Sequence, residues 1–480
     1  MISLLLQQLL VALVTGGSGF LGGHVVETFL EAGYRTILVI REKSFLLNSK
    51  TIQSWAERYP NSFQFMLCDL SNESTSLEGA LLDSNRMISL KDVNCIINCA
   101  SPFKRSYTNS IEDIVEPTFS IVKNVIIFAA AVRQSQLNSG DDKTAYEGSQ
   151  SKKLRIVHVS SSAALRGAGQ VPFNPTSLKD YSLPSPVQTT ASKCLAHDKG
   201  MFSTVDWNIC SKVDGRGMQS YQFVKTVSEQ MIHEMALNID CDLVSILPVT
   251  MLGPICKGQQ DNTKHLCQKM SEANFSDNIN DELQSFANVG ISAQFIRDWQ
   301  SGVLKQENRI IADVRDVALA ILNAAEINLE NISFRVAESE NETPSVCLSP
   351  SAISKDCSKS KTQKGSIDWL KTGFYTHFDL LASCIRSRRF HRRRFIIGGS
   401  KRIEHSAIEN ILVTNGFSGG SLAVSETDMK NNASFRTDVD ELNISKTSDS
   451  ILLGGLGIIC RKWEETILDT AIQYYNQNQV

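Results

Sequence analysis

Short apolar runs alternate with longer amphipathic stretches along the first half of the chain. The amphipathic stretches predict helices at residues 24–32, 114–132 and 220–238. The apolar runs predict buried strands at residues 11–14, 36–40, 63–67, 95–98, 156–159 and 243–247. Strands that alternate with helices in this way are typical of a parallel sheet with helices on both faces. We therefore expect an α/β fold with a doubly wound parallel sheet.

The turn between the first strand and the first helix is rich in glycine. Residues 15–22 are T-G-G-S-G-F-L-G. Glycine is required where a chain turns tightly and where its backbone approaches a pyrophosphate, and the phosphates then bind free N–H groups at the helix N-terminus. A Gly-rich run alone is weak evidence, because surface loops also collect glycine. Its strand and helix flanks favour a Rossmann-type dinucleotide-binding domain.

A tyrosine and a lysine begin the third predicted helix. Tyr221 and Lys225 are four positions apart, so they share one face of that helix. A nearby ammonium favours the phenolate, which makes the phenol a usable proton donor or acceptor near neutral pH. The fifth strand ends in three serines, residues 160–162, where parallel sheets bind ligands. A hydroxyl there can hold a substrate carbonyl, although a turn or a helix cap uses the same residue type.

Composition narrows the class of protein. At 480 residues the chain can form one large domain with a second domain or sizeable insertions. Lys and Arg number 48 against 51 acidic residues, a net charge of −3 that indicates neither nucleic acid nor an anionic membrane as a partner. The 12 cysteines lack paired metal-ligand spacing. We therefore expect reduced thiols, no metal site and a cytoplasmic location.

Neither apolar end of the chain predicts a membrane segment. Residues 1–14 have no basic residue ahead of their apolar run, and they lead directly into the Gly-rich turn, unlike a signal peptide. Residues 451–460 are apolar but too few to span a bilayer.

The composition changes along the chain predict two domains and several insertions. We expect the dinucleotide-binding domain at residues 1–250 and a smaller, mixed substrate-binding portion at residues 251–480. Polar insertions interrupt the first domain near residues 138–153 and 167–206, and the second of these follows the fifth strand, where loops face the ligand crevice. The Ser- and Lys-rich, aperiodic stretch at residues 339–372 predicts a disordered insertion.

Residues 386–394 (RSRRFHRRR) are strongly basic. Such a run could be a nuclear signal or a phosphate-binding surface, but short basic runs are of low specificity. We interpret it as the solvated edge of an insertion.

Motifs in a fixed order over nearly the whole chain carry a family resemblance. They are VTGGSGFLGGHVVETFLEAGY, the second strand ending in Arg41, the CDL of residues 68–70, IINCASP, EPTFSIVKNVIIFAA, IVHVSSSAAL, YQFVKTVSEQM, SILPVTMLGP, ADVRDVALAI and RKWEETILDT. In this order they resemble the extended short-chain dehydrogenases/reductases of the NAD-dependent epimerase/dehydratase superfamily. More narrowly, the chain is similar to the dihydroflavonol reductase and cinnamoyl-CoA reductase branch, with 3β-hydroxysteroid dehydrogenases as more distant relatives.

The resemblance implies a catalytic triad. Ser162, Tyr221 and Lys225 match the triad residues, and Asn124 matches the family's structural Asn on the central helix. The activity implied is NADP-dependent reduction of a ketone or aldehyde carbonyl in a small organic substrate. Tyr221 would pass the proton and Lys225 would bind the nicotinamide ribose, while Ser162 would polarise the carbonyl. Tyr221 follows Ser162 after a gap that is longer than the family's usual one, which leaves the substrate open.

The resemblance also implies a set of cofactor-binding residues. They are Gly16, Gly19, Phe20, Leu21, Gly22, Arg41, Asp69, Leu70, Ala100, Ser101, Pro102, Tyr221, Lys225 and Pro248. The glycines match the pyrophosphate turn, Asp69 the adenine contact, and Pro248 the proline beside the nicotinamide. The second strand ends in Arg41 with no acidic residue at its end, and a cation there suits a 2′-phosphate. NADP(H) is therefore expected in preference to NAD(H).

Two other functions stay open: a nucleotide-sugar epimerase or dehydratase, and a non-catalytic NADP-sensing protein. The dehydratases use an acidic residue near the catalytic serine, where this chain has Ala163 and Ala164. Sensing proteins commonly lose the tyrosine or the lysine, and this chain has both. Helices 114–132 and 220–238 carry wide apolar faces that form a dimer interface in relatives. We expect a homodimer, although burial of these faces within one chain fits the pattern equally.

Overall fold

A computed structural model describes most of the first half of the chain and separate segments of the second. The described residues are 10–72, 76–83, 88–102, 108–139, 153–167, 170, 202, 204, 206–213, 218–260, 295–296, 298, 310–327, 390, 393–399, 403–417, 456 and 458–478. The predicted insertion at residues 339–372, the first nine residues and most of the two polar excursions lie outside this set.

Seven parallel strands form the central sheet, in the order β3-β2-β1-β4-β5-β6-β9. Their bounds are β1 Val11–Thr15, β2 Arg35–Ile40, β3 Phe63–Leu67, β4 Val93–Asn98, β5 Arg155–Val159, β6 Asp242–Pro248 and β9 Arg394–Ile397. The six strands expected from the apolar runs are confirmed. The strand order changes direction between β1 and β4, and doubly wound sheets bind their ligands at the carboxyl ends beside such a point.

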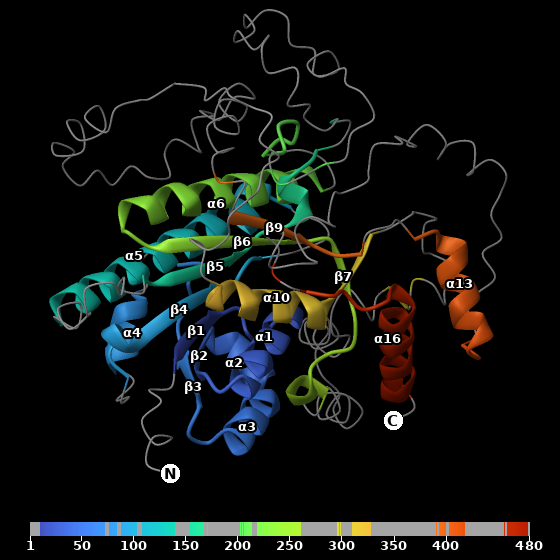
Figure 1. The fold of residues 1–480 in the computed structure, drawn as a ribbon, viewed down its shortest axis with the longest axis horizontal. Helices are drawn as coiled ribbons and strands as arrows, with labels where there is room; N and C mark the ends of the chain where they lie inside the picture. The colour runs from blue at the N-terminus through green and yellow to red at the C-terminus, as the bar shows by residue number, and fades with distance from the viewer. Residues whose placement is uncertain are drawn as a thin grey trace, which may run out of the picture.

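Helices cover both faces of this sheet, as the alternating pattern predicts (Figure 1). On one face lie α1 (Phe20–Glu31) and α10 (Val314–Glu326), which pack against each other. On the other face α5 (Glu116–Asn138) packs beside α6 (Gln219–Asn238). The connections carry α2 (Glu42–Leu47), α3 (Ser49–Arg58) and α4 (Leu77–Asp83). The doubly wound α/β architecture is therefore confirmed.

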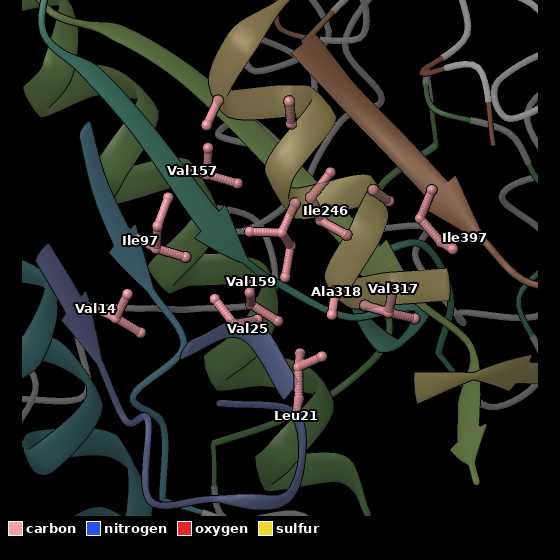
Figure 2. Packing of buried hydrophobic residues seen from close by; sticks show 14 of the residues in the cluster. Val14, Leu21, Val25, Ile97, Val157, Val159, Ile246, Val317, Ala318 and Ile397 are labelled. Carbon is pink, nitrogen blue, oxygen red and sulfur yellow. The ribbon is translucent and has the colours of Figure 1, made fainter. Parts of the chain in front are cut away.

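The α10 helix brings a part of the chain from beyond residue 250 onto the first sheet. Figure 2 shows Val317 and Ala318 of α10 packed with Val159 and Ile246 of the central strands, and all four side chains are buried. Burial of this apolar stripe is the main source of stability for such a helix. An element from beyond the expected boundary therefore packs on the central sheet, and the boundary itself stays a prediction.

The end of the basic run at residues 386–394 is part of the sheet. Arg394 begins β9, which pairs in parallel with β6, and its side chain is fully buried. Phe390, within the same run, is also buried. The interpretation of this run as a solvated edge is therefore wrong for its described end. The apolar residues of β9 pull the strand into the core, and an acidic partner compensates the buried guanidinium.

A smaller cluster of elements follows the carboxyl end of β6. Strand β7 (Thr250–Leu252) pairs with β8 (Ile311–Asp313), and α16 (Trp463–Asn478) packs against both of them and against α13 (His405–Thr414). In Figure 1 these two helices lie to the side of the sheet toward which β6 runs. The RKWEETILDT motif, residues 461–470, includes the start of α16.

Within the described ranges, one helix is long and apolar enough to cross a membrane, the continuous stretch Ile111–Asn138. It consists of a π-helical turn, Ile111–Val115, followed by α5. In its most apolar window 67% is buried inside the molecule. This burial is the pattern of a core helix, which passes the same test of length and composition.

Candidate active site

The Gly-rich turn between β1 and α1 leaves no room for side chains at two positions. Gly16 has φ +69°, and a Cβ on it would lie 2.6 Å from the backbone nitrogen of Ala100. A Cβ on Gly22 would clash with the backbone of Gly16 and lie 2.6 Å from Cα of Gly17. The turn is closed by a hydrogen bond of 3.0 Å from the Gly19 amide to the Gly16 carbonyl. Only glycine lets this backbone fold so tightly at the start of a helix.

The helix that follows the turn offers its N-terminus to a ligand. Gly19 is the N-cap of α1, has an extended backbone, and is exposed. Phe20 is half-buried and Leu21 is buried, so both side chains turn toward the protein while their amides lie in the first turn. First-turn amides have no partner within their own helix, which is the arrangement that binds phosphate. A pyrophosphate therefore fits this turn.

The segment after β4 forms a wall beside the turn. Thr15 Oγ1 donates to Asn98 Oδ1 over 2.8 Å and accepts the Ala100 amide over 3.3 Å. These bonds hold the chain that leaves β4 beside the end of β1. Within the described residues the buried hydroxyl oxygen of Ser101 has no hydrogen-bond partner. Such a group is costly to leave unpaired, so it fits a polar contact with a bound ligand. Ser101 and Pro102 are half-buried.

The loop after β3 is held from the central helix. Asn124 is buried on α5, and its amide nitrogen donates to the carbonyls of Leu70 (2.9 Å) and Asn72 (3.0 Å). Asp69 is exposed in this loop, where its carboxylate accepts the backbone amide and the hydroxyl of Ser71. The structure therefore places Asn124 as a support of the loop that carries Asp69. A catalytic role for Asn124 stays a prediction.

Arg41 lies at the end of β2, beside the strand that leads into the Gly-rich turn. It is exposed, and its guanidinium donates to the hydroxyl of Ser44 over 3.3 Å. Lys43 is also exposed in the first turn of α2. This end of β2 therefore carries positive charge that solvent or a ligand can reach.

Tyr221 and Lys225 share one face of α6. The Lys225 ammonium nitrogen lies 5.8 Å from the centre of the Tyr221 ring. It is buried and donates to the carbonyl of Val159, the last residue of β5, over 3.3 Å. Burial lowers the pKa of Lys225 to about 8, although the charges of Cys99 and Glu229 oppose the shift. The lysine is therefore mostly an ammonium at neutral pH and titrates within a physiological range.

Among the described residues, the hydroxyls of Ser160 and Ser161 after β5 have hydrogen-bond partners, and that of Ser162 has none. The hydroxyl of Ser160 donates to Glu229 on α6 over 2.7 Å. The hydroxyl of Ser161 caps a short 3-10 turn, Ser162–Ala164, by accepting the Ala163 amide. This turn packs against α6, the helix that carries the tyrosine and the lysine. The structure thus brings the elements of the expected triad together.

A segment that the sequence did not single out, residues 206–213, links the serine turn after β5 to α6. Asn208 is fully buried, and its backbone amide donates to the carbonyl of Ala164 over 2.8 Å. Its side chain donates to Ser211, whose hydroxyl donates in turn to Gln222, next to the tyrosine. The chain that returns from the long loop therefore ties the serine turn to α6. This contact holds the serine turn and α6 together across the long gap in sequence between them.

Beneath the site, a buried hydrogen-bond chain crosses the sheet. Asn98 on β4 accepts from Thr15 on β1, and its amide nitrogen lies 3.1 Å from Nδ1 of His158 on β5. Burial, together with the charge of Lys225, lowers the pKa of His158 to about 3, so the ring is neutral. Pro248, at the buried end of β6, pairs with β9. A contact of Pro248 with nicotinamide stays a prediction.

Comparison with known proteins agrees with this geometry. Residues 12–192 match the NAD dependent epimerase/dehydratase family. The chain is 24% identical over 131 residues to the ketoreductase azaE of Aspergillus niger, covering 26% of this chain and 36% of that protein. It is 30% identical over 121 residues to aldehyde reductase 2 of Sporidiobolus salmonicolor, covering 25% and 32%. These matches thus span about a third of the length of each curated relative.

Solved structures show the same fold. The yeast methylglyoxal/isovaleraldehyde reductase Gre2 complexed with NADPH has a TM-score of 0.54 at 18% identity, covering 98% of this chain and 99% of that one. A Candida albicans Gre2 in complex with NADPH has a TM-score of 0.51 at 16% identity, with the same coverage. With its Gly-rich turn, its parallel sheet and its sequence match, the region of residues 12–192 is similar to the NAD dependent epimerase/dehydratase family.

Proposed function

We propose that this protein is an NADP-dependent reductase that converts a ketone or aldehyde carbonyl of a small organic substrate to an alcohol. The observation that carries the proposal is the buried Lys225 ammonium, 5.8 Å from the Tyr221 ring centre at the carboxyl edge of the sheet. Two curated relatives named as reductases support it. The turn after β5 offers Ala163 and Ala164 beside Ser162, where a dehydratase would need an acid.

Each residue of the triad has a distinct task in such a reaction. NADPH, when bound, supplies a hydride. Ser162 donates a hydrogen bond to the carbonyl oxygen and so stabilises the negative charge that develops there. Tyr221 gives this oxygen its proton, as a general acid. Lys225 stabilises the phenolate that remains, and it binds the ribose hydroxyls through the ammonium protons not used by Val159.

Lys225 gives the reaction a pH dependence. Its pKa of about 8 means that the ammonium is lost as the pH rises through that value. We expect kcat/KM for the carbonyl substrate to be level near neutral pH and to fall above about pH 8. A pH profile of the purified protein measures this directly. A rate that stays constant well above that pH would show that the charge of Lys225 is not required.

Arg41 is proposed to select NADP(H) over NAD(H). Arg41→Ala should weaken NADPH binding by about 10–100-fold, because a charge-assisted hydrogen bond contributes about 1.5–3 kcal/mol. NADH binding should hardly change. Fluorescence titration with both cofactors measures the two affinities. Arg35→Ala, at the opposite end of the same strand, is the control. Preference of the wild type for NADH, or unchanged NADPH affinity in Arg41→Ala, would contradict the assignment.

The proposed reaction is tested by incubating the protein and NADPH with a panel of aldehydes and ketones of phenolic, flavonoid, steroid and simple aliphatic types. We expect consumption of NADPH with formation of an equal amount of alcohol for at least one class. Conversion of a nucleotide sugar without net consumption of the cofactor would favour the epimerase alternative. Tight NADPH binding with no turnover of any compound would favour a sensing protein. The homodimer and the cytoplasmic location stay predictions.

A further inference from the structure

The last arginine of the basic run is paired with a carboxylate inside the protein. Arg394 Nε on β9 lies 2.8 Å from Glu229 Oε1 on α6, and both side chains are fully buried. A second guanidinium nitrogen lies 3.3 Å from Glu229 Oε2. Buried charges are tolerated only when they are paired and hydrogen-bonded. This pair is therefore a defined structural feature and not a surface contact.

The rest of the Arg394 guanidinium is also occupied. Its remaining terminal nitrogen donates to the backbone carbonyls of Thr204 and Asp206, each over 2.7 Å. Its central carbon lies 3.6 Å from the centre of the Trp207 ring. These contacts fix the arginine from three sides, and an arginine suits them because its planar fork has several donors and can stack on a ring.

Glu229 in turn contacts both elements that carry the site. It accepts the Ser160 hydroxyl over 2.7 Å, two residues before Ser162. It also follows Lys225 by one turn of α6, so the two side chains lie on the same face of the helix. The carboxylate therefore holds the end of β5 against α6, and it places a negative charge near the lysine.

We propose that Glu229 and Arg394 are positioning residues of the reductase site. Glu229 holds the face of α6 that carries Lys225 against the end of β5, and Arg394 fixes the orientation of the Glu229 carboxylate. The role of the two residues in catalysis rests on the proposed function. Their contacts are present in the structure whatever reaction the protein catalyses.

The surroundings of Lys225 show why Glu229 is the decisive charge. The lysine is faced by Cys99 from the end of β4, by His158 from β5, and by Tyr221 and Glu229 from α6. Burial raises the pKa of Cys99 to about 12 and lowers that of His158 to about 3, so both are neutral near pH 7. Of these groups, Glu229 is the carboxylate, and it is paired with Arg394.

Loss of that charge should lower the pH at which Lys225 gives up its proton. Burial already lowers the pKa of this lysine, and the charge of Glu229 opposes the shift. In Glu229→Gln the opposition is removed while the shape of the side chain is kept. A purely structural role of Glu229 would change the stability of the protein but not this titration.

The test uses the full chain with isotope-labelled lysine side chains. The Lys225 signal is assigned by its absence in Lys225→Met, and its chemical shift is followed against pH by NMR. We expect the midpoint in Glu229→Gln to fall by about half a pH unit or more, with a matching fall in the alkaline limb of kcat/KM. The control is Arg393→Lys, which changes the neighbouring arginine, itself paired with Asp242 at 3.4 Å.

Thermal unfolding confirms that each variant is folded before it is titrated. If Glu229→Gln does not fold, the double variant Glu229→Gln/Arg394→Met is used, because it removes both buried charges together. Removing both partners of a buried ion pair costs less stability than removing one. A smaller fall of the midpoint is expected there, because the positive charge of Arg394 is removed together with the carboxylate. An unchanged midpoint in the folded variant, or an equal shift in Arg393→Lys, overturns the assignment. Absence of reductase activity in the wild type would reject the proposed function, while the NMR titration would still decide this inference.

Discussion

Tyr221→Phe is expected to lower kcat by about 10²–10⁴-fold, the usual contribution of a positioned general acid. The ring stays in place beside the Lys225 ammonium, so the affinity for NADPH should remain close to that of the wild type. Steady-state kinetics with the best substrate of the panel and a fluorescence titration with NADPH measure the two quantities. A large fall in kcat with unchanged cofactor affinity identifies the phenol as the proton donor.

Tyr34→Phe is the matched control for this substitution. Its hydroxyl donates to Glu326 over 3.1 Å at the opposite side of the domain core, between the start of β2 and the end of α10. Loss of that hydrogen bond should cost about 0.5–1.5 kcal/mol of stability and leave kcat unchanged. If Tyr221→Phe keeps wild-type turnover, another group supplies the proton and the mechanism is wrong.

Gly22→Ala should weaken NADPH binding by about 10–100-fold or more. The added methyl group would meet the backbone of Gly16 and Gly17, and backbone cannot move aside as a flexible side chain can. Overpacking of this kind costs about 1–3 kcal/mol, and here the strain falls on the turn that would hold the pyrophosphate. Isothermal titration calorimetry with NADPH measures the change in affinity.

Gly79→Ala provides the comparison for this substitution. Among the described residues, a Cβ at that position on α4 would meet the Ser76 side chain, at 3.4 Å, which is an ordinary contact. This variant should bind NADPH like the wild type and should be no less stable, since alanine favours a helix. Wild-type NADPH affinity in a folded Gly22→Ala protein would mean that the cofactor does not use the Gly-rich turn.

The central sheet was predictable from the sequence because its strands are buried on both faces. Such strands form continuous apolar runs, and Val11–Thr15 and Asp242–Pro248 are examples whose cores are almost entirely apolar. Strand β9 was missed for the opposite reason. Its first residue is Arg394, within a run of arginines, and a strand of four residues is too short to outweigh that charge. Tertiary partners, Glu229 among them, make this arginine a core residue.

In the candidate site, too, local contacts could be predicted from the sequence and tertiary contacts could not. The spacing of Tyr221 and Lys225 is local, because one helical turn brings them to the same face, and so the sequence alone predicted their pairing. The contact of Arg394 with Glu229 joins residues 165 positions apart, and no periodicity marks it. The support of the serine turn by Asn208 is likewise a tertiary contact. Such contacts depend on how the elements pack, which local patterns do not encode.

The proposal that this site reduces carbonyls is tested most directly by tracing the hydride. NADPH with both hydrogens at C4 of its nicotinamide replaced by deuterium is incubated with the protein and a carbonyl substrate, and the product is analysed by mass spectrometry and NMR. The predicted result is one deuterium on the carbon that was the carbonyl carbon, in an amount equal to the NADPH consumed, and lost in Tyr221→Phe. An alcohol without deuterium, or consumption of NADPH without any alcohol, would contradict it.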